Sequence, residues 1–362
     1  MPVRLRTLRT VARLPDGAAV DRIVGMCSAA ATDARTLRLD LLAEIRRIVG
    51  FDAYAWLLTD PETCVGSAPL ADVPCLPELP RLIRLKYLTV VNRWTGLPAG
   101  GVATLATATG GDRSRSRLWR ELLEAYQVGD VASVVFRDRH GCWGFMDLWR
   151  VGATRAFTAA EAAFLAGIAP AVTTALRRCV AATFMPPVAA DRPGPVVLLL
   201  SADLRLLAQT PQTAAYLRAL VPPERDAAPV PAGAYNVAAQ LLAAEASVDR
   251  NPAVARVHLS AGRWVSLRAA RIADPPAKLP AAIAVTIEQA SPQERLVIFA
   301  RSCALTSRET ALLRLLSTGS DTRELARRMS VSEHTVQDHL KSIFTKTGTR
   351  SRRDLLARTL GG

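Results

Sequence analysis

Polar side chains that can pair with nucleic-acid bases recur along one side of a helical pattern near the C-terminus. Successive residues of a helix are turned by about 100°, so Val336, Leu340 and Ile343 fall on one side of this segment. The other side and its flanks carry hydroxyl, imidazole, amide, carboxylate and ammonium groups: Ser332, His334, Thr335, Gln337, Asp338 and Lys341. In a major groove, an amide can pair with adenine, a carboxylate with cytosine, and an ammonium with guanine or phosphate. We therefore expect this face to contact double-stranded DNA.

Two shorter helical segments precede this face and are expected to hold it in place. Each begins with the spacing of a capping box, in Thr306-Ser-Arg-Glu309 and in Asp321-Thr-Arg-Glu324. Gly319 ends the first of them. The turn Ser330-Val-Ser332 separates the second from the polar helix, for which Ser332 is the expected N-cap. Two helices joined by a short turn, the second with a polar face, are typical of a helix-turn-helix.

At these positions the chain resembles the LuxR/NarL family of bacterial regulators. The matching residues keep the spacing of the family's four-helix unit: Leu305-Thr-Ser-Arg-Glu309, Leu315-Leu316, Gly319, Glu324-Leu-Ala326, Ser332, Thr335-Val336, His339, Ile343, Lys346, Gly348 and Arg352. Ser330 is one departure, because the family usually has glycine in this turn, and serine fits there at some conformational cost. The resemblance implies a DNA-binding regulator of transcription that is not an enzyme.

The resemblance also implies roles for individual residues. Three polar residues are expected to read bases: Gln337, Asp338 and Lys341. Three basic residues are expected to contact the DNA backbone: Lys346, Arg350 and Arg352. Three leucines of the fourth helix, 351–360, are expected to form a dimer contact: Leu355, Leu356 and Leu360. The partners implied are therefore double-stranded DNA, RNA polymerase and a second copy of the chain.

The chain carries an excess of positive charge, with 46 basic and 32 acidic side chains and a formal charge of +14. Residues 301–362 contribute twelve basic and six acidic side chains to this balance. Such an excess favours a polyanionic partner, either nucleic acid or an anionic membrane. The longest apolar-leaning run, Ala162 to Leu176, is too short to span a bilayer, and no continuous apolar segment follows the basic N-terminus. We therefore expect a cytoplasmic protein without a membrane partner.

Two turn-rich stretches divide the chain into three domains. The first is the linker 186–195, rich in proline, and the second is the linker 290–304. The first domain, 1–185, mixes helices with strands, and the second domain, 196–289, repeats this pattern on a smaller scale. We expect a multidomain fold, in which two α+β sensor-type domains are followed by an all-α four-helix LuxR-type helix-turn-helix domain at 305–362.

The first domain looks like the GAF-type sensors that precede such DNA-binding domains. The resemblance lies in 51–61 (Phe-Asp-Ala-Tyr-Ala-Trp-Leu-Leu-Thr-Asp-Pro), in 106–112 ahead of a helix, and in Cys142-Trp-Gly144 within a hairpin that turns at 138–141. The second domain looks PAS-like from its strand order and from 195–205 (Pro-Val-Val-Leu-Leu-Leu-Ser-Ala-Asp-Leu-Arg). Both resemblances imply a signal that modulates DNA binding, with a small-molecule ligand as the candidate, and neither identifies the ligand.

Three features of the first domain are candidate ligand sites. The run Thr109 to Ser114 before a helix can bind an anion, although a solvated loop is the commoner use of such a run. Three tryptophans can line a pocket, although aromatic residues in strands usually form core: Trp56, Trp143 and Trp149. His140 and Cys142 beside a turn offer two isolated metal or redox ligands. The six cysteines are otherwise scattered, without the clustering that a zinc site needs, so we expect no metal and no cofactor.

Two other functions remain open. An alternative sigma factor shares the helix-turn-helix signal, but the helices that bind core polymerase are missing upstream, and the leucines of the fourth helix argue against it. An enzyme with a regulatory tail needs a nucleophile–base–acid set or a metal cluster, and neither is recognisable in the sequence.

Overall fold

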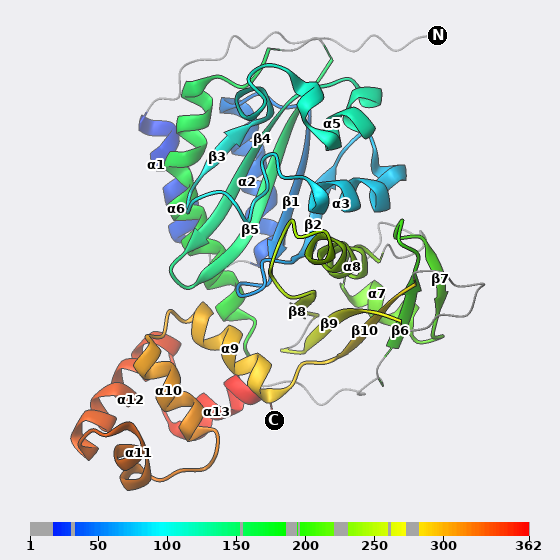
Figure 1. Ribbon diagram of the computed structural model, residues 1–362. Helices are drawn as coiled ribbons and strands as arrows, with labels where there is room; N and C mark the ends of the chain where they lie inside the picture. The colour runs from blue at the N-terminus through cyan, green and yellow to red at the C-terminus, as the bar shows by residue number, and fades with distance from the viewer. Residues whose placement is uncertain are drawn as a thin grey trace.

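The computed structural model describes residues 17–29, 33–152, 155–185, 194, 196–220, 231–259, 262–272 and 282–361. Two five-stranded antiparallel sheets and a C-terminal group of helices make up this part of the chain (Figure 1). The expected fold class is confirmed at this level of two antiparallel α+β units followed by a helical region. The basic N-terminus and all of the expected linker 186–195 except Gly194 lie outside the described residues.

The first sheet, sheet A, contains the hairpin that the sequence predicts. Its strands are β1 (Ala53–Thr59), β2 (Gly66–Asp72), β3 (Val102–Thr104), β4 (Val128–Asp138) and β5 (Gly141–Val151). The strand order is β2-β1-β5-β4-β3, and every adjacent pair is antiparallel. At the turn between β4 and β5, the Asp138 carboxylate accepts hydrogen bonds from the backbone N–H groups of His140 and Gly141. Because this Asx-type turn depends on residues that are close in the sequence, the hairpin could be predicted from the sequence.

Different helices cover the two faces of sheet A (Figure 1). One face is covered by α1 (Gly17–Ala29), α2 (Ala34–Ile48) and α6 (Ala159–Ala182). The other face is lined by short elements: η1 (Leu76–Glu78), α3 (Leu79–Leu88), α4 (Leu105–Ala108), η2 (Arg113–Arg115), α5 (Arg117–Glu121) and η3 (Leu123–Tyr126). Side chains alternate along β5, so Met146 and Leu148 enter the core with α6 whereas Phe145, Asp147 and Trp149 point toward α3.

Helix α6 is, within the described residues, the one helix long and apolar enough to cross a membrane. It is longer than the uncharged run from Ala162 to Leu176, because Arg177 and Arg178 continue the helix. Phe164, Leu165 and Ile168 of this helix are buried in the core with α1, α2 and sheet A. It is therefore a core helix of the first domain.

The second sheet, sheet B, repeats the strand order of sheet A. Its strands are β6 (Val196–Leu200), β7 (Leu206–Gln209), β8 (Val254–His258), β9 (Trp264–Arg271) and β10 (Ile283–Gln289). They run in the order β7-β6-β10-β9-β8, so in both sheets the first strand lies between the second and the fifth. Two helices accompany the sheet, α7 (Thr213–Leu220) and α8 (Ala232–Glu245).

Helix α8 joins the two sheet domains into one packed body. Most of its residues are apolar and ten of the fourteen are buried, as is typical of a helix that is covered from more than one side. One side packs on sheet B, mainly on β9, and the other packs on α3 and β2 of the first domain (Figure 1). A single hydrophobic cluster accordingly contains Leu57, Tyr87 and Phe145 of the first domain together with Val237 and Leu267 of the second.

Buried ion pairs reinforce this contact between the domains. Arg256 of β8 binds Asp60 of the first domain through two nitrogens, at 2.6 and 2.7 Å, and the Asp60 side chain has no exposed surface. Arg93 likewise binds Asp249, at 2.7 Å, with both side chains buried. The Thr63 hydroxyl donates to the Val254 carbonyl at 2.6 Å. Two of the three expected domains are therefore joined by a shared hydrophobic core and by buried polar contacts.

The C-terminal region contains five helices: α9 (Pro292–Ser302), α10 (Ser307–Leu316), α11 (Thr322–Met329), α12 (Glu333–Thr347) and α13 (Arg352–Leu360). Helix α9 occupies most of the segment 290–304, where the sequence predicts a linker. Ser291 and Glu294 form a complete capping box at its start. Leu296 and Phe299 are buried in the same cluster as Phe184 and Trp264 of the upstream domains, so the segment packs as a helix.

The buried pair of Asp60 and Arg256 yields a test of the domain contact. Replacing Arg256 with leucine leaves a fully buried carboxylate without its cation, so we expect the free energy of unfolding to fall by about 3–5 kcal/mol. The matched control is Arg117→Ala, which breaks the exposed pair with Glu121 and should cost at most about 1 kcal/mol. Urea unfolding of the full chain measures both. Equal losses for the two variants would contradict a structural role for the pair.

Candidate DNA interface and ligand cavity

The helices of the C-terminal region begin at the capping residues that the sequence indicates. The Thr306 hydroxyl accepts a hydrogen bond from the Glu309 N–H at 3.2 Å, and the Glu309 carboxylate accepts one from the Thr306 N–H at 2.6 Å. Asp321 accepts from the Glu324 N–H at 2.8 Å. These contacts satisfy amides that a helix start leaves free, which fixes where α10 and α11 begin.

The turn between α11 and α12 is the one that a helix-turn-helix requires. Ser330 closes α11 in the left-handed conformation, with φ +54°, at the position where glycine is usual. The Ser332 hydroxyl then caps α12 by accepting from the Thr335 N–H at 3.1 Å. The left-handed residue changes the direction of the chain within a turn of three residues, 330–332, so that α12 packs against α11.

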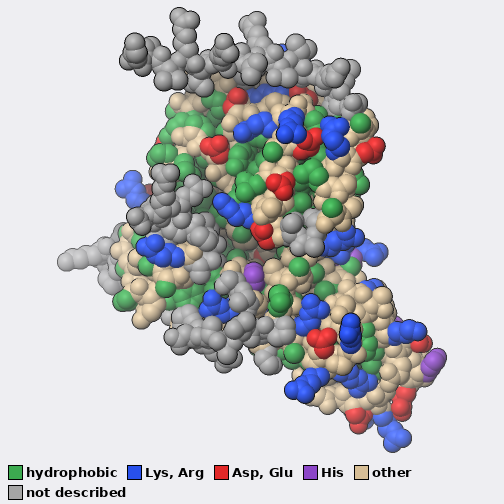
Figure 2. Space-filling model, turned by 180° about the vertical axis from the view of Figure 1, so that it is seen from behind, with side chains coloured by type: hydrophobic (Ala, Val, Ile, Leu, Met, Phe, Trp, Pro, Cys, Tyr) green, Lys and Arg blue, Asp and Glu red, His purple; other side chains and the backbone are tan. Residues whose placement is uncertain are grey.

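Helix α12 has an inner apolar side and an outer polar side, as expected. Val336, Leu340 and Ile343 are buried in the core of the region. Several of the predicted DNA-contacting side chains are exposed: Ser332, His334, Gln337, Asp338 and Lys341. Thr335 is half-buried. His334 and Asp338 lie one turn apart, with 3.7 Å between Nε2 and Oδ2. Lys and Arg side chains gather over the surface of this C-terminal region (Figure 2).

The basic residues expected at the DNA backbone fall into different environments. Arg350 is exposed. Arg352 is half-buried, and its Nη2 donates to the Thr322 hydroxyl at 2.9 Å. The Lys346 ammonium binds both oxygens of the buried Glu309, at 2.7 and 2.8 Å, and therefore braces α10 against α12. Sequence reasoning missed this pairing, because Glu309 already has a local explanation as a capping residue.

Helix α13, the fifth helix of this region, carries the three leucines expected at a dimer contact. Leu355 has no exposed surface and lies in the core, so this side chain is not available to a second chain. Leu356 and Leu360 are partly buried against the same cluster. The inward face of α13 packs on α9, where Arg295 donates to the backbone carbonyls of Arg358 and Thr359. A dimer contact through Leu356 and Leu360 stays a prediction.

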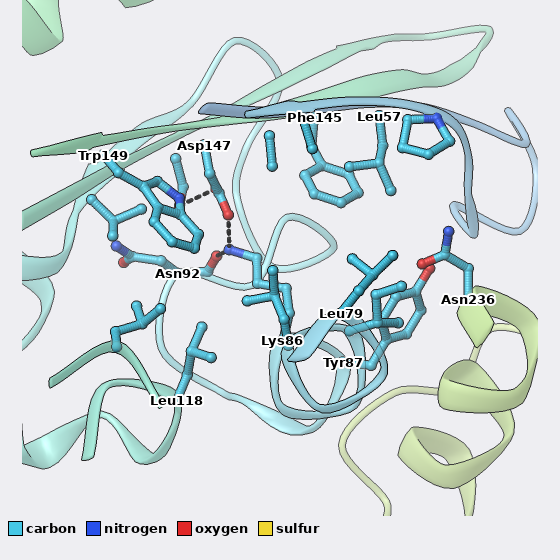
Figure 3. A pocket seen from close by; sticks show the side chains of 18 of the residues that line it. Leu57, Leu79, Lys86, Tyr87, Asn92, Leu118, Phe145, Asp147, Trp149 and Asn236 are labelled. Atoms are coloured by element: carbon cyan, nitrogen blue, oxygen red, sulfur yellow. Dashed lines mark hydrogen bonds and ion pairs between the residues drawn. The ribbon is translucent and has the colours of Figure 1, made fainter. Parts of the chain in front are cut away.

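An apolar cavity of about 220 Å³ lies between sheet A, α3 and helix α8 of the second domain (Figure 3). Leu57, Leu79 and Phe145 occupy its middle. At one end are Trp149, Asn92 and the ion pair of Lys86 and Asp147, and at the other end are Tyr87 and Asn236 (Figure 3). Of these residues the sequence reasoning named only Trp149, because the others come from segments far apart in the chain.

The other ligand candidates are structural in this fold. Trp56 and Trp143 belong to the core on the opposite face of sheet A, so they do not line the cavity. In the run from Thr109 to Ser114, Asp112 caps the following turn and the Thr109 hydroxyl donates to the Leu105 carbonyl. Cys142 is buried. Over the described part of the chain, no three His, Cys, Asp or Glu side chains come together as a metal site would require.

Residues 303–358 match the family model for bacterial regulatory proteins of the luxR family. The C-terminal domain is a LuxR-type helix-turn-helix. The match covers the C-terminal region of the chain, and its family is one of bacterial regulatory proteins. No curated protein matches the chain.

Two solved structures align with most of the chain at low similarity. A crystal structure of Escherichia coli SdiA aligns with a TM-score of 0.33 and 11% identity, over 94% of this chain and 95% of that one. SdiA in complex with octanoyl-rac-glycerol aligns with a TM-score of 0.32 and 11% identity, over 94% of this chain and 93% of that one.

Glu309 is a strongly perturbed carboxylate of the LuxR-type domain. Burial alone raises the pKa of this group, but hydrogen bonds from Lys346, Ser342 and the Thr306 N–H outweigh burial and lower the pKa to about 2. A lowered pKa means that the ionised form is bound more tightly in the folded state. The resulting stability is present above the ordinary glutamate pKa and is lost as the pH falls toward 2.

Replacing Glu309 with glutamine therefore tests the ion pair of Glu309 with Lys346, which holds α10 against α12. At pH 7 we expect the LuxR-type domain to lose about 3 kcal/mol of stability, from the size of the pKa shift. This difference from the wild type should shrink as the pH falls from about 4.5 toward 2, because the wild-type carboxylate becomes neutral. Hydrogen exchange of α10 and α12 amides in the full chain measures this difference in stability. The control is Glu324→Gln, which removes an exposed ion pair with Arg327. A loss of stability in Glu309→Gln no larger than that of the control would contradict a stabilising role for the pair of Glu309 and Lys346.

Proposed function

We propose that this chain is a sequence-specific, DNA-binding transcriptional regulator that acts as a homodimer in the cytoplasm and contacts RNA polymerase. The observation that carries the proposal is the LuxR-type helix-turn-helix with an exposed polar face on α12. Gln337 and Lys341 make no side-chain hydrogen bond or ion pair within the described residues, so their donors are free for base edges. Asp338 lies beside them and can accept from cytosine.

We also infer that the upstream domains are GAF-like and PAS-like sensor modules. Two antiparallel sheets with the same strand order support this interpretation, as does an apolar cavity against sheet A. In this scheme a signal bound upstream changes how the LuxR-type domain engages DNA. The packing of α9 against both the upstream domains and α13 provides the physical connection.

The double variant Gln337→Ala with Lys341→Ala tests whether the polar face of α12 contacts the bases. Each residue is assigned a base contact worth about 1–3 kcal/mol, so we expect affinity for an operator to fall by about 100-fold or more. The operator is first selected from a random duplex library with the wild-type chain. The control is Gln209→Ala with Arg218→Ala, which removes the same two kinds of side chain from exposed positions of the second domain.

Salt dependence provides a second readout of the same interface. Neutralisation of several phosphates should make the wild-type affinity fall by orders of magnitude between about 50 and 200 mM salt. The double variant should show a shallower dependence, because one cation is lost. The proposed base contacts of α12 would be ruled out if the double variant protected the same operator with unchanged affinity, or if the affinity of the wild type did not depend on salt.

A further inference from the structure

The cavity against sheet A is completed by the second domain. Its long wall comes from β1, β5 and α3, and Ala232 and Asn236 of α8 close one end (Figure 3). A cavity of about 150 Å³ accommodates benzene, which has six carbon atoms. In proportion, the 220 Å³ here accommodate roughly nine non-hydrogen atoms. The size of the site therefore indicates a small molecule rather than a peptide or a nucleotide.

Asn236 is the residue at this site whose side chain has both a donor and an acceptor left unsatisfied. Its side chain is 1% exposed, and neither its amide oxygen nor its amide nitrogen has a hydrogen-bond partner among the described residues. Gln240, one turn further along α8, is also buried, yet it donates to the Asn251 carbonyl at 2.8 Å and accepts from Arg93 at 3.2 Å. Buried amides normally find partners, so the contrast indicates that Asn236 serves a molecule in the cavity.

Charge at the opposite end of the cavity is already balanced. Lys86 Nζ lies 2.8 Å from an Asp147 oxygen, and the Ser133 hydroxyl donates to the other oxygen at 2.7 Å. Both charged side chains are buried, so a charged ligand would bring an uncompensated charge into an apolar site. Trp149 at this end has a buried indole N–H that meets no acceptor in the described part of the chain and can donate to a neutral acceptor.

We propose that the cavity binds a neutral, mainly apolar small molecule whose single amide-like group pairs with Asn236. An amide-like group both donates and accepts, and so it matches the two unsatisfied atoms of Asn236. The remainder of the molecule lies among Leu57, Leu79 and Phe145. Asn236 is thus a specificity-determining residue that the second domain supplies to a site in the first. This inference rests on the proposed sensory role of the upstream domains.

Heptanamide is a suitable probe, because it has nine non-hydrogen atoms and one terminal amide. Isothermal titration calorimetry of the full wild-type chain should detect its binding, with heptanoate at neutral pH at least tenfold weaker. Asn236→Leu should weaken heptanamide binding by about tenfold or more. The same variant should bind n-propylbenzene, an apolar probe of nine carbons, as tightly as the wild type or more tightly. Gln209→Leu makes the same change at an exposed site and should alter neither affinity.

Absence of heptanamide binding to the wild type would overturn the proposal, and so would unchanged binding to Asn236→Leu. If Asn236→Leu does not fold, Asn236→Ser replaces it. Serine is shorter, and its single oxygen cannot form the two side-by-side hydrogen bonds that an amide forms, so the same loss is expected. Binding of the wild type to its selected operator is measured on the same preparation. Operator binding without heptanamide binding removes only this inference, whereas heptanamide binding without operator binding removes the proposed function.

Discussion

The packing of helix α8 between two domains is the constraint on which the rest of the upstream structure depends. Nine of the fourteen residues of α8 are alanine, valine or leucine, and ten of the fourteen are buried, so the helix must be covered from more than one direction. Sheet B covers one side, and α3 with β2 covers the other. The buried pair of Asp60 and Arg256 then lies at the border of a shared core, where its desolvation is compensated by two short hydrogen bonds.

The same packing accounts for the cavity. Sheet A offers an apolar face through Leu57 and Phe145, and α3 covers only part of it. Helix α8 closes the remaining end with small side chains such as Ala232, which cannot fill the space beneath them. The buried amide of Asn236 enters this space because it lies on the side of α8 that faces the first domain. Cavity and domain contact are therefore two results of one helix.

The parts of the fold that were predictable from the sequence depend on local signals. The capping pairs of Thr306 with Glu309 and of Asp321 with Glu324 lie three residues apart, and the β4–β5 hairpin turns at one aspartate. The apolar side of α12 repeats at helical spacing. Signals of this kind do not depend on where other segments lie, so the LuxR-type domain and its polar face could be inferred from the order of residues alone.

The rest of the site depends on contacts between residues far apart in the chain. Lys86, Asp147 and Asn236 meet at one cavity although more than sixty residues separate Lys86 from Asp147 and nearly ninety separate Asp147 from Asn236. Nothing local distinguishes Asn236 from the satisfied Gln240 one turn away. The pairing of Lys346 with Glu309 was hidden for a similar reason, because the position of a lysine on a helix does not say which element packs beside it.

Helix α9 has a consequence for the geometry of the DNA site. It passes into α10 through Ala304, a left-handed residue, and the Leu305 N–H is bound to the Ala300 carbonyl, so the two helices meet at a defined angle. Arg295 also joins α13 to Gly262 of the second domain. In the proposed homodimer, two chains built in this way would present their α12 helices at a fixed distance and a fixed rotation about the DNA axis. One extra base pair between half-sites turns one of them by roughly 35° about the duplex axis, which such an assembly can follow only by deforming the DNA or breaking these joints.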